Sequence, residues 1–166
     1  MNQLLISLME FSRASCKEIQ KERVDLSRIA NKVAANIRLN DTERTVNFNI
    51  MADIEVSGDM CLLQEVLENL FGIAWKYTEL KESATIEFGV NERDGKPVYF
   101  VRDNGIGFEM NQAAKMFEIF NRLHCMDKFK GYGIGLATVK RIIQRHGGEI
   151  WAEGKVGKGA TVYFTL

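Results

Sequence analysis

The apolar pattern changes from helical to strand periodicity in the middle of the chain, and this change limits the fold more than any other feature. Between residues 60 and 78, apolar residues recur at the spacing of one helix face. They are Leu62, Leu63, Val66, Leu67, Leu70 and Ala74. Residues 85–90 then alternate between apolar and polar, Asp94-Gly95 supplies a turn, and residues 98–101 form an apolar run. This order predicts a long amphipathic helix followed by a β-hairpin.

The rest of the chain shows the same two periods in shorter segments. We expect helices over residues 2–20, from a cap at Asp25 or Ser27 onward, over 111–120 and over 136–145. Strands are expected over residues 46–50, 54–56, 149–152 and 160–166. The charged residues 17–23 indicate a linker, and the polar, glycine-bearing residues 121–133 indicate a loop. Helices and antiparallel hairpins in this order predict an α+β fold in two layers.

The helix expected at residues 2–20 has two interpretations. Its apolar residues either pack on the same domain, or they belong to the end of a long dimerisation helix. The second interpretation is suggested by an apolar stripe that begins at the first residues without a capping residue. The pattern alone does not separate the two.

Composition excludes several classes of partner and site. The chain has 22 Lys plus Arg and 22 Asp plus Glu, so it has no general attraction to nucleic acid or to an anionic membrane. The 3 cysteines and 2 histidines lack metal-ligand spacing, and the odd cysteine count favours a reducing compartment. No apolar run approaches the ~18 residues of a membrane span. We therefore expect a cytoplasmic module without membrane contact of its own, which leaves open an anchor elsewhere in a longer protein.

Glycine is the most informative residue for ligand binding. Most of the 14 glycines lie from Gly105 onward, in the clusters Gly105/Gly107, Gly131/Gly133/Gly135 and Gly154/Gly157/Gly159. Glycine lets a ligand approach the backbone, and successive N–H groups of such loops hold phosphate. Neither the dinucleotide fingerprint nor the phosphate-binding P-loop fits their spacing and neighbouring elements.

Five motifs together resemble those of one protein family. They are Asn69-Leu-Phe-Gly-Ile-Ala-Trp-Lys-Tyr-Thr78, Asp103-Asn-Gly-Ile-Gly-Phe108, Phe117-Glu-Ile-Phe120, Gly131-Tyr-Gly-Ile-Gly-Leu136 and Gly157-Lys-Gly-Ala-Thr161. In order and spacing they resemble the N box, first glycine box, F box and later glycine boxes of sensor histidine kinases, within the superfamily that includes gyrase, Hsp90 and MutL. The resemblance implies an ATP-binding Bergerat sandwich over residues 23–166, with a mixed sheet of about five strands on about three helices. Residues 1–22 would then be the end of a dimerisation helix and a linker.

The resemblance also implies the roles of individual residues. Asp103 would accept a hydrogen bond from the adenine amino group, supported by Thr161, and Tyr77 would pack near the base or ribose. Asn69, Lys76 and Arg122 would be catalytic, with Asn69 at the metal and the two cations at the phosphates. The other expected ATP contacts are Gly105, Ile106, Gly107, Phe120, Gly131, Tyr132, Gly133, Ile134, Gly135 and Leu136. Residues 121–133 would form a lid over ATP.

Two departures from the family pattern affect the expected function. The acceptor histidine of such kinases lies on a dimerisation helix, and neither His124 nor His146 does, so we expect the acceptor outside these 166 residues. The family places a magnesium-binding asparagine four residues after Asn69, where this chain has Ile73. An aliphatic side chain supplies no oxygen to Mg²⁺.

The expected function is phosphoryl transfer from ATP to a histidine within a two-component sensor kinase. The expected partners are ATP or ADP, the kinase's own dimerisation helices in a homodimer, and a response regulator. Because of Ile73, a degenerate pseudokinase that binds nucleotide or docks a partner remains the alternative. An ATPase is disfavoured, because the amide of Asn69 cannot serve as a base for water.

Overall fold

The computed structural model describes residues 2–16, 18–121 and 133–166. Its centre is a five-stranded mixed sheet with the strand order β2-β4-β5-β7-β6. β2 (Val46–Ile50) runs parallel to β4 (Ala84–Arg93). β4 pairs antiparallel with β5 (Lys96–Asp103), β5 with β7 (Gly159–Phe164), and β7 with β6 (Ile150–Lys155). The predicted α+β sandwich with a mixed sheet is confirmed.

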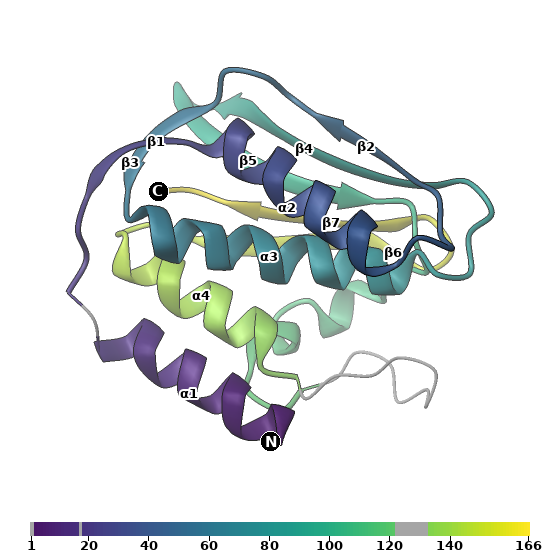
Figure 1. Ribbon diagram of the computed structural model, residues 1–166, viewed down its shortest axis with the longest axis horizontal. Helices are drawn as coiled ribbons and strands as arrows, with labels where there is room; N and C mark the ends of the chain where they lie inside the picture. Colours follow the sequence, from purple (N-terminus) through teal and green to yellow (C-terminus); the bar gives the residue numbers. More distant parts are fainter. Residues whose placement is uncertain (1, 17, 122–132) are drawn as a thin grey trace.

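The second layer of the sandwich consists of helices packed on one face of the sheet (Figure 1). They are α2 (Leu26–Asn40), α3 (Met60–Tyr77) and α4 (Gly135–Arg145), with α3 packed between the other two. The side chains of Asp25 and Asp59 cap α2 and α3 by accepting hydrogen bonds from backbone N–H groups in the first turn. Between the layers, Phe71 of α3 packs against Phe48 and Phe88 of the sheet. The long helix and the hairpin therefore form where the periodicity predicts them.

An N-terminal helix, α1 (Gln3–Cys16), packs against α4 on the side away from α3 (Figure 1). Ala14 is fully buried in this contact, and Arg145 donates a hydrogen bond to its carbonyl oxygen. The outer side of α1 exposes Leu5, Ile6 and Met9. This arrangement agrees with a helix packed on its own domain, and the exposed outer side keeps the dimerisation helix as a proposal. None of the helices described for this chain combines the length and apolarity needed to cross a bilayer.

The prediction of a linker over residues 17–23 is wrong at its end. Residues Glu22–Asp25 form β1, which pairs antiparallel with β3 (Glu55–Gly58) in a separate two-stranded sheet. Val24 is the buried side chain of β1, and an ion pair between Arg23 and Glu55 lies on its exposed side. A single apolar residue among charged ones gives too weak an alternation to reveal a strand.

The helix predicted over residues 111–120 is also wrong. Two single 3₁₀ turns, η1 (Met110–Gln112) and η2 (Lys115–Phe117), replace it, and neither has a side-chain cap. Only Met116 and Phe117 are buried there, and Phe120 has a φ of 64°, which ends helical geometry. The loop predicted over residues 121–133 falls almost entirely outside the described residues.

A buried aspartate links the segment that follows α1 to two helices of the main layer. Asp59 is 3% exposed, and its carboxylate accepts from the N–H of Leu62 and from the N–H of Gln20, both at 3.1 Å. Its own N–H donates to Nε2 of His146 at 3.1 Å. The His146 proton must then lie on Nδ1, which is 2.8 Å from the carbonyl oxygen of Ile142. Hydrogen bonds of Asp59 thus connect the start of α3 and the end of α4 to the backbone at Gln20.

Candidate nucleotide-binding site

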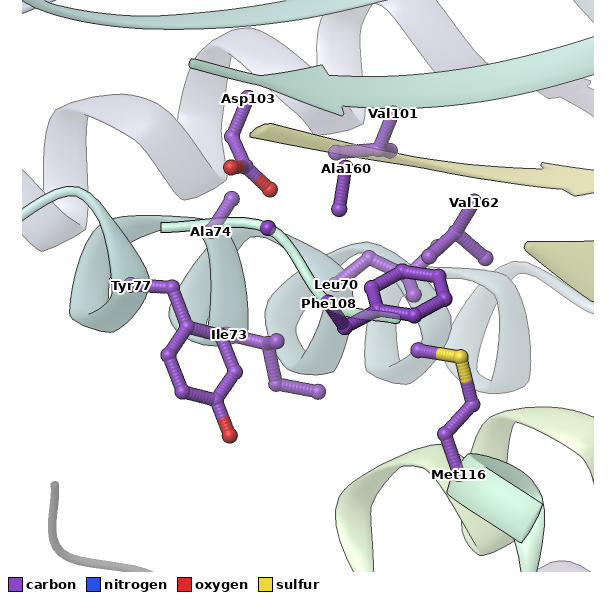
Figure 2. A pocket seen from close by; sticks show the side chains of 11 residues that line it. Leu70, Ile73, Ala74, Tyr77, Val101, Asp103, Phe108, Met116, Ala160 and Val162 are labelled. Atoms are coloured by element: carbon purple, nitrogen blue, oxygen red, sulfur yellow. The ribbon is translucent and has the colours of Figure 1, made fainter. Parts of the chain in front are cut away.

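A small pocket, partly open to solvent, lies between α3 and the sheet. Residues of α3, β5, β7, η2 and the loop after β5 surround it (Figure 2). They are Leu70, Ile73, Ala74, Tyr77, Val101, Asp103, Gly107, Phe108, Met116, Ala160 and Val162. Almost all of them are apolar, as in a site for a flat ring system.

The lining follows from the two periodicities of the sequence. Leu70, Ile73, Ala74 and Tyr77 are spaced by three and four residues, so they share one face of α3. On β5 and β7 the residues that reach the pocket are alternate ones, since successive strand side chains point to opposite faces. The helix face and the sheet face meet at the ends of both strands.

Asp103 is the charged side chain of the lining. It ends β5, and its carboxylate points toward α3 (Figure 2). Burial raises the pKa of Asp103 from 3.8 to about 6, although hydrogen bonds from the N–H groups of Gly105 (2.8 Å) and Ala160 partly oppose this rise. An acceptor in an apolar pocket favours a ligand that brings a hydrogen-bond donor, such as an exocyclic amine.

The loop after β5 approaches other backbone segments so closely that glycine is required. An added Cβ at Gly105 would lie 2.3 Å from the carbonyl oxygen of Tyr77. At Gly107, where φ is 67°, it would lie 2.0 Å from the carbonyl oxygen of Lys155. Between them, Ile106 donates its N–H to the Tyr77 carbonyl at 3.1 Å and accepts from Gly157 at 2.7 Å. The predicted Gly105, Ile106 and Gly107 therefore form a rigid backbone wall beside the pocket.

The start of α4 faces Asn69 of α3. An added Cβ at Gly135, the first residue of α4, would lie 2.8 Å from Oδ1 of Asn69. Ile134 occupies the capping position without a side-chain hydrogen bond, so N–H groups of the first turn lack that partner. Leu136 follows as a partly buried residue of α4. This helix end suits an anionic group next to Asn69.

Three other predicted residues, Lys76, Phe120 and Gly133, do not line the pocket. The Nζ of Lys76 is 5.3 Å from the centre of the Tyr77 ring. Phe120 is 59% exposed, and its N–H donates to the carbonyl oxygen of Gly133, which has a φ of 70°. Arg122, Gly131, Tyr132 and nearly all of the predicted lid fall outside the described residues.

The structure does not bring Thr161 to the pocket. β7 pairs with β5 so that Ala160 lies opposite Asp103 and Thr161 lies opposite Arg102. Ala160 and Val162 line the pocket, so the alternation of the strand directs Thr161 to the other face of the sheet. There its Oγ1 is 3.3 Å from Nε of Arg102. The prediction that Thr161 supports Asp103 is therefore corrected: the neighbouring residue, Ala160, lies opposite Asp103 in the pocket.

Sequence reasoning missed the residues that make the pocket apolar. They are Leu70, Ala74, Val101, Phe108, Met116, Ala160 and Val162. The helical spacing to Tyr77 and the strand alternation around Asp103 would have identified most of them. Met116 had no such signal, because it reaches the pocket from a 3₁₀ turn.

The residues of this site do not fit a magnesium ion. Ile73 lines the pocket at the position where the family pattern requires an oxygen ligand, and its Cδ1 lies 3.7 Å from the added Cβ of Gly135. The neighbouring Asn69 uses its amide nitrogen to donate to the Glu65 carbonyl oxygen at 2.9 Å. Across the part of the chain that the structure describes, no group of three or more His, Cys, Asp or Glu residues could hold a metal ion.

Comparisons with known proteins agree with this arrangement. Residues 58–166 match the family described as "Histidine kinase-, DNA gyrase B-, and HSP90-like ATPase". The whole chain is 36% identical to part of cyanobacterial phytochrome B from Nostoc sp. strain PCC 7120, of which it covers 22%. It is 32% identical to part of the sensor histidine kinase WalK from Bacillus subtilis, of which it covers 28%. The chain thus spans less than a third of the length of these curated relatives.

Solved structures show the same fold. Full-length ShkA in complex with AMPPNP superimposes with a TM-score of 0.80 at 25% identity, over 98% of this chain and 34% of that chain. The mycobacterial sensor histidine kinase MprB superimposes with a TM-score of 0.72 at 20% identity, over 87% of this chain and 95% of that chain. The chain therefore belongs to the histidine kinase-, DNA gyrase B- and HSP90-like ATPase family, as an ATP-binding domain of the sensor histidine kinase type.

Proposed function

We propose that this chain is the catalytic module of a two-component sensor kinase, which moves the γ-phosphoryl group of ATP to a histidine outside these 166 residues. The observation that carries the proposal is the Asp103 carboxylate in an apolar pocket, beside the glycine wall of Gly105 to Gly107. A carboxylate in that place accepts a hydrogen bond from the adenine amino group. The apolar residues of α3 and β7 cover the two faces of the base.

The phosphates extend from the adenine pocket toward the start of α4. The N–H groups at Gly135 and the positive end of the α4 dipole favour the phosphate charge. Lys76 contributes a cation from α3, and Arg122 is the second proposed cation. In the transfer, the bond between the γ-phosphorus and the β–γ bridging oxygen breaks, a bond to an imidazole nitrogen forms, and ADP leaves. Asn69 presents an amide and not a carboxylate, so hydrolysis by water is slow in comparison.

The proposed partners follow from this role. They are ATP and ADP, the dimerisation helices of the complete kinase in a homodimer, and a response regulator that takes the phosphoryl group. The role also places the module in the cytoplasm, where ATP and response regulators are found. Residues 1–22 are proposed as the end of a dimerisation helix and its connection to the catalytic domain.

The second candidate is a pseudokinase that binds nucleotide without transferring phosphate. Ile73 favours it, because Mg²⁺ normally neutralises the charge that develops on the phosphates during transfer. The two candidates share the adenine pocket and differ in chemistry.

A two-stage experiment separates these candidates. ADP binding is first titrated calorimetrically with the chain and with Asp103→Asn. The chain is then supplied with γ-labelled ATP and the histidine-bearing dimerisation helices of its complete kinase. Acid-labile label on those helices supports the kinase, whereas ADP binding without transfer supports the pseudokinase. Absence of ADP binding in the folded chain would reject both.

A further inference from the structure

We infer that this site binds adenine nucleotides in their metal-free form, through the adenosine end, so that Mg²⁺ adds little to their affinity. The inference rests on the proposed nucleotide function and narrows it to one mode of binding. It is carried by the position of Ile73 in the wall of the pocket (Figure 2) and by the contacts of Asn69.

Ile73 stands between the adenine end and the phosphate end of the site. It is four residues after Asn69 and four before Tyr77, so all three side chains lie along one face of α3. Its branched side chain lines the pocket together with Tyr77 and Asp103. A cation at this position would lose part of its water shell and gain no ligand in return, which Mg²⁺ resists strongly.

Asn69 alone does not replace the missing ligand. Its amide nitrogen is held by the carbonyl oxygen of Glu65 at 2.9 Å, which fixes the direction of the side chain. Its Oδ1 faces the backbone of Gly135 so closely that an added Cβ there would lie 2.8 Å away. Mg²⁺ requires nearly octahedral oxygen coordination at about 2.1 Å, and a single amide oxygen supplies only one of those ligands.

Glu65 is the carboxylate that could oppose this inference, because it lies one turn before Asn69 on α3. Its Oε1 is buried without a hydrogen-bond partner. Burial raises its pKa to about 7, with smaller contributions from the carboxylates of Glu10 on α1 and Glu68 on α3. These three carboxylates do not form a group able to hold a metal ion. We therefore treat Glu65 as a competing ligand to be tested directly.

The adenosine end of the site is complete without a metal. Asp103, the wall from Gly105 to Gly107 and the apolar lining are all in place. Lys76 and the uncapped start of α4 offset phosphate charge by themselves. Affinity then depends on the adenosine moiety, and ADP and ATP bind in EDTA about as well as in magnesium.

The test is isothermal titration of the whole chain with ADP and with ATP, each in EDTA and in saturating MgCl₂. The expected dissociation constants agree within about threefold between the two conditions, which is below 1 kcal/mol. Ile73→Asn should introduce a magnesium dependence of at least about tenfold for ATP. Leu39→Asn is the matched control, since it makes the same kind of substitution at a residue of α2 that is 74% exposed and outside the pocket. Leu39→Asn should bind both nucleotides with the same affinity and the same small magnesium dependence as the unmodified chain.

The possible results distinguish failure of this inference from failure of the proposed nucleotide function. A strong magnesium dependence in the unmodified chain overturns the inference, and the loss of that dependence in Glu65→Gln would identify Glu65 as the competing ligand. A magnesium response in Ile73→Asn no larger than in the unmodified chain also overturns it, provided that circular dichroism shows the variant to be folded. If the unmodified chain binds neither nucleotide in either condition, the proposed nucleotide function itself fails.

Discussion

Replacing Asp103 by asparagine should stabilise the nucleotide-free domain at neutral pH and at the same time weaken nucleotide binding. The carboxylate is buried among apolar side chains, and its pKa rises from 3.8 to about 6. A pKa above the unfolded value means that the folded protein prefers the protonated acid. Ionised Asp103 therefore destabilises the fold, and asparagine of the same shape carries no charge.

The magnitude follows from the pKa shift and the hydrogen bonds. A shift of this size corresponds to roughly 3 kcal/mol between the two protonation states. Asparagine offers one neutral acceptor oxygen in place of a charged carboxylate, so the hydrogen bonds from Gly105 and Ala160 are weakened, which costs about 1 to 1.5 kcal/mol. The net gain at pH 7 is then about 1.5 to 2 kcal/mol, or a few degrees in Tm.

The pH dependence gives the sign of the effect. Below about pH 4 Asp103 is protonated in both states, so its ionisation does not destabilise the fold. Between pH 4 and 6 the folded state holds more protons than the unfolded state, so stability falls as pH rises, and the loss is complete above pH 6. In Asp103→Asn this contribution to the slope disappears.

Urea denaturation at pH 4 and pH 7 measures the stability, and calorimetric titration with ADP measures the binding. ADP affinity should fall by about 2 kcal/mol, or roughly thirtyfold, because a hydrogen bond to a charged group is lost. Asp94→Asn, at an exposed turn residue with a φ of 53°, is the matched control and should change neither quantity. Equal stability of Asp103→Asn and the unmodified chain at pH 7 would refute the argument from burial. Unchanged ADP affinity would remove Asp103 from the adenine site.

Three further substitutions test other parts of the structure. Gly107→Ala should lower the free energy of unfolding by at least about 2 kcal/mol, because its φ is 67° and its Cβ would meet Lys155, whereas Gly95→Ala should cost only about 1 kcal/mol; similar urea midpoints would contradict the close approach. Burial and nearby carboxylates raise the pKa of Glu65 to about 7, so its ionised form destabilises the fold. Glu65→Gln should therefore raise the free energy of unfolding by about 1 kcal/mol above pH 8, after allowance for its partial exposure, and should not change it below pH 4. A gain in stability at pH 4 would show another cause. His146→Ala should lower the free energy of unfolding by about 2 kcal/mol in thermal or urea unfolding, since it leaves the buried N–H of Asp59 without its acceptor; a neutral result would indicate that water replaces the ring.

Much of the fold could be predicted because the long elements have unambiguous periods. α3 buries its six predicted apolar residues along one face, and the hairpin turns at Asp94-Gly95 as expected. Asp103 was found from its motif, and the structure places it in the pocket. Local patterns were sufficient there, since each of these features depends on residues close together in sequence.

The errors arose where the deciding contact is distant in sequence or a matter of register. β1 forms because β3, about thirty residues later, offers an edge with which it can pair. The single apolar residue Val24 is too weak a pattern to predict this strand. Thr161 was predicted at the pocket from its motif, but the pairing of Ala160 with Asp103 fixes the faces of β7 and directs Thr161 to the other side of the sheet. Met116 reaches the pocket through irregular turns that have no period.

The hydrogen bonds of Asp59 hold one end of α3 and one end of α4 at the same point. α3 begins at this carboxylate and α4 ends beside it at His146, whereas Asn69 and Gly135 meet farther along the same two helices. Because both helices are stiff rods, a small displacement of the Gln20 amide acts at this point on both. The gap where the phosphates are proposed to lie is therefore bounded by two helices that share this carboxylate with the chain leaving α1. Because α1 also packs directly on α4, a displacement of α1 reaches α4 both through that contact and through Asp59.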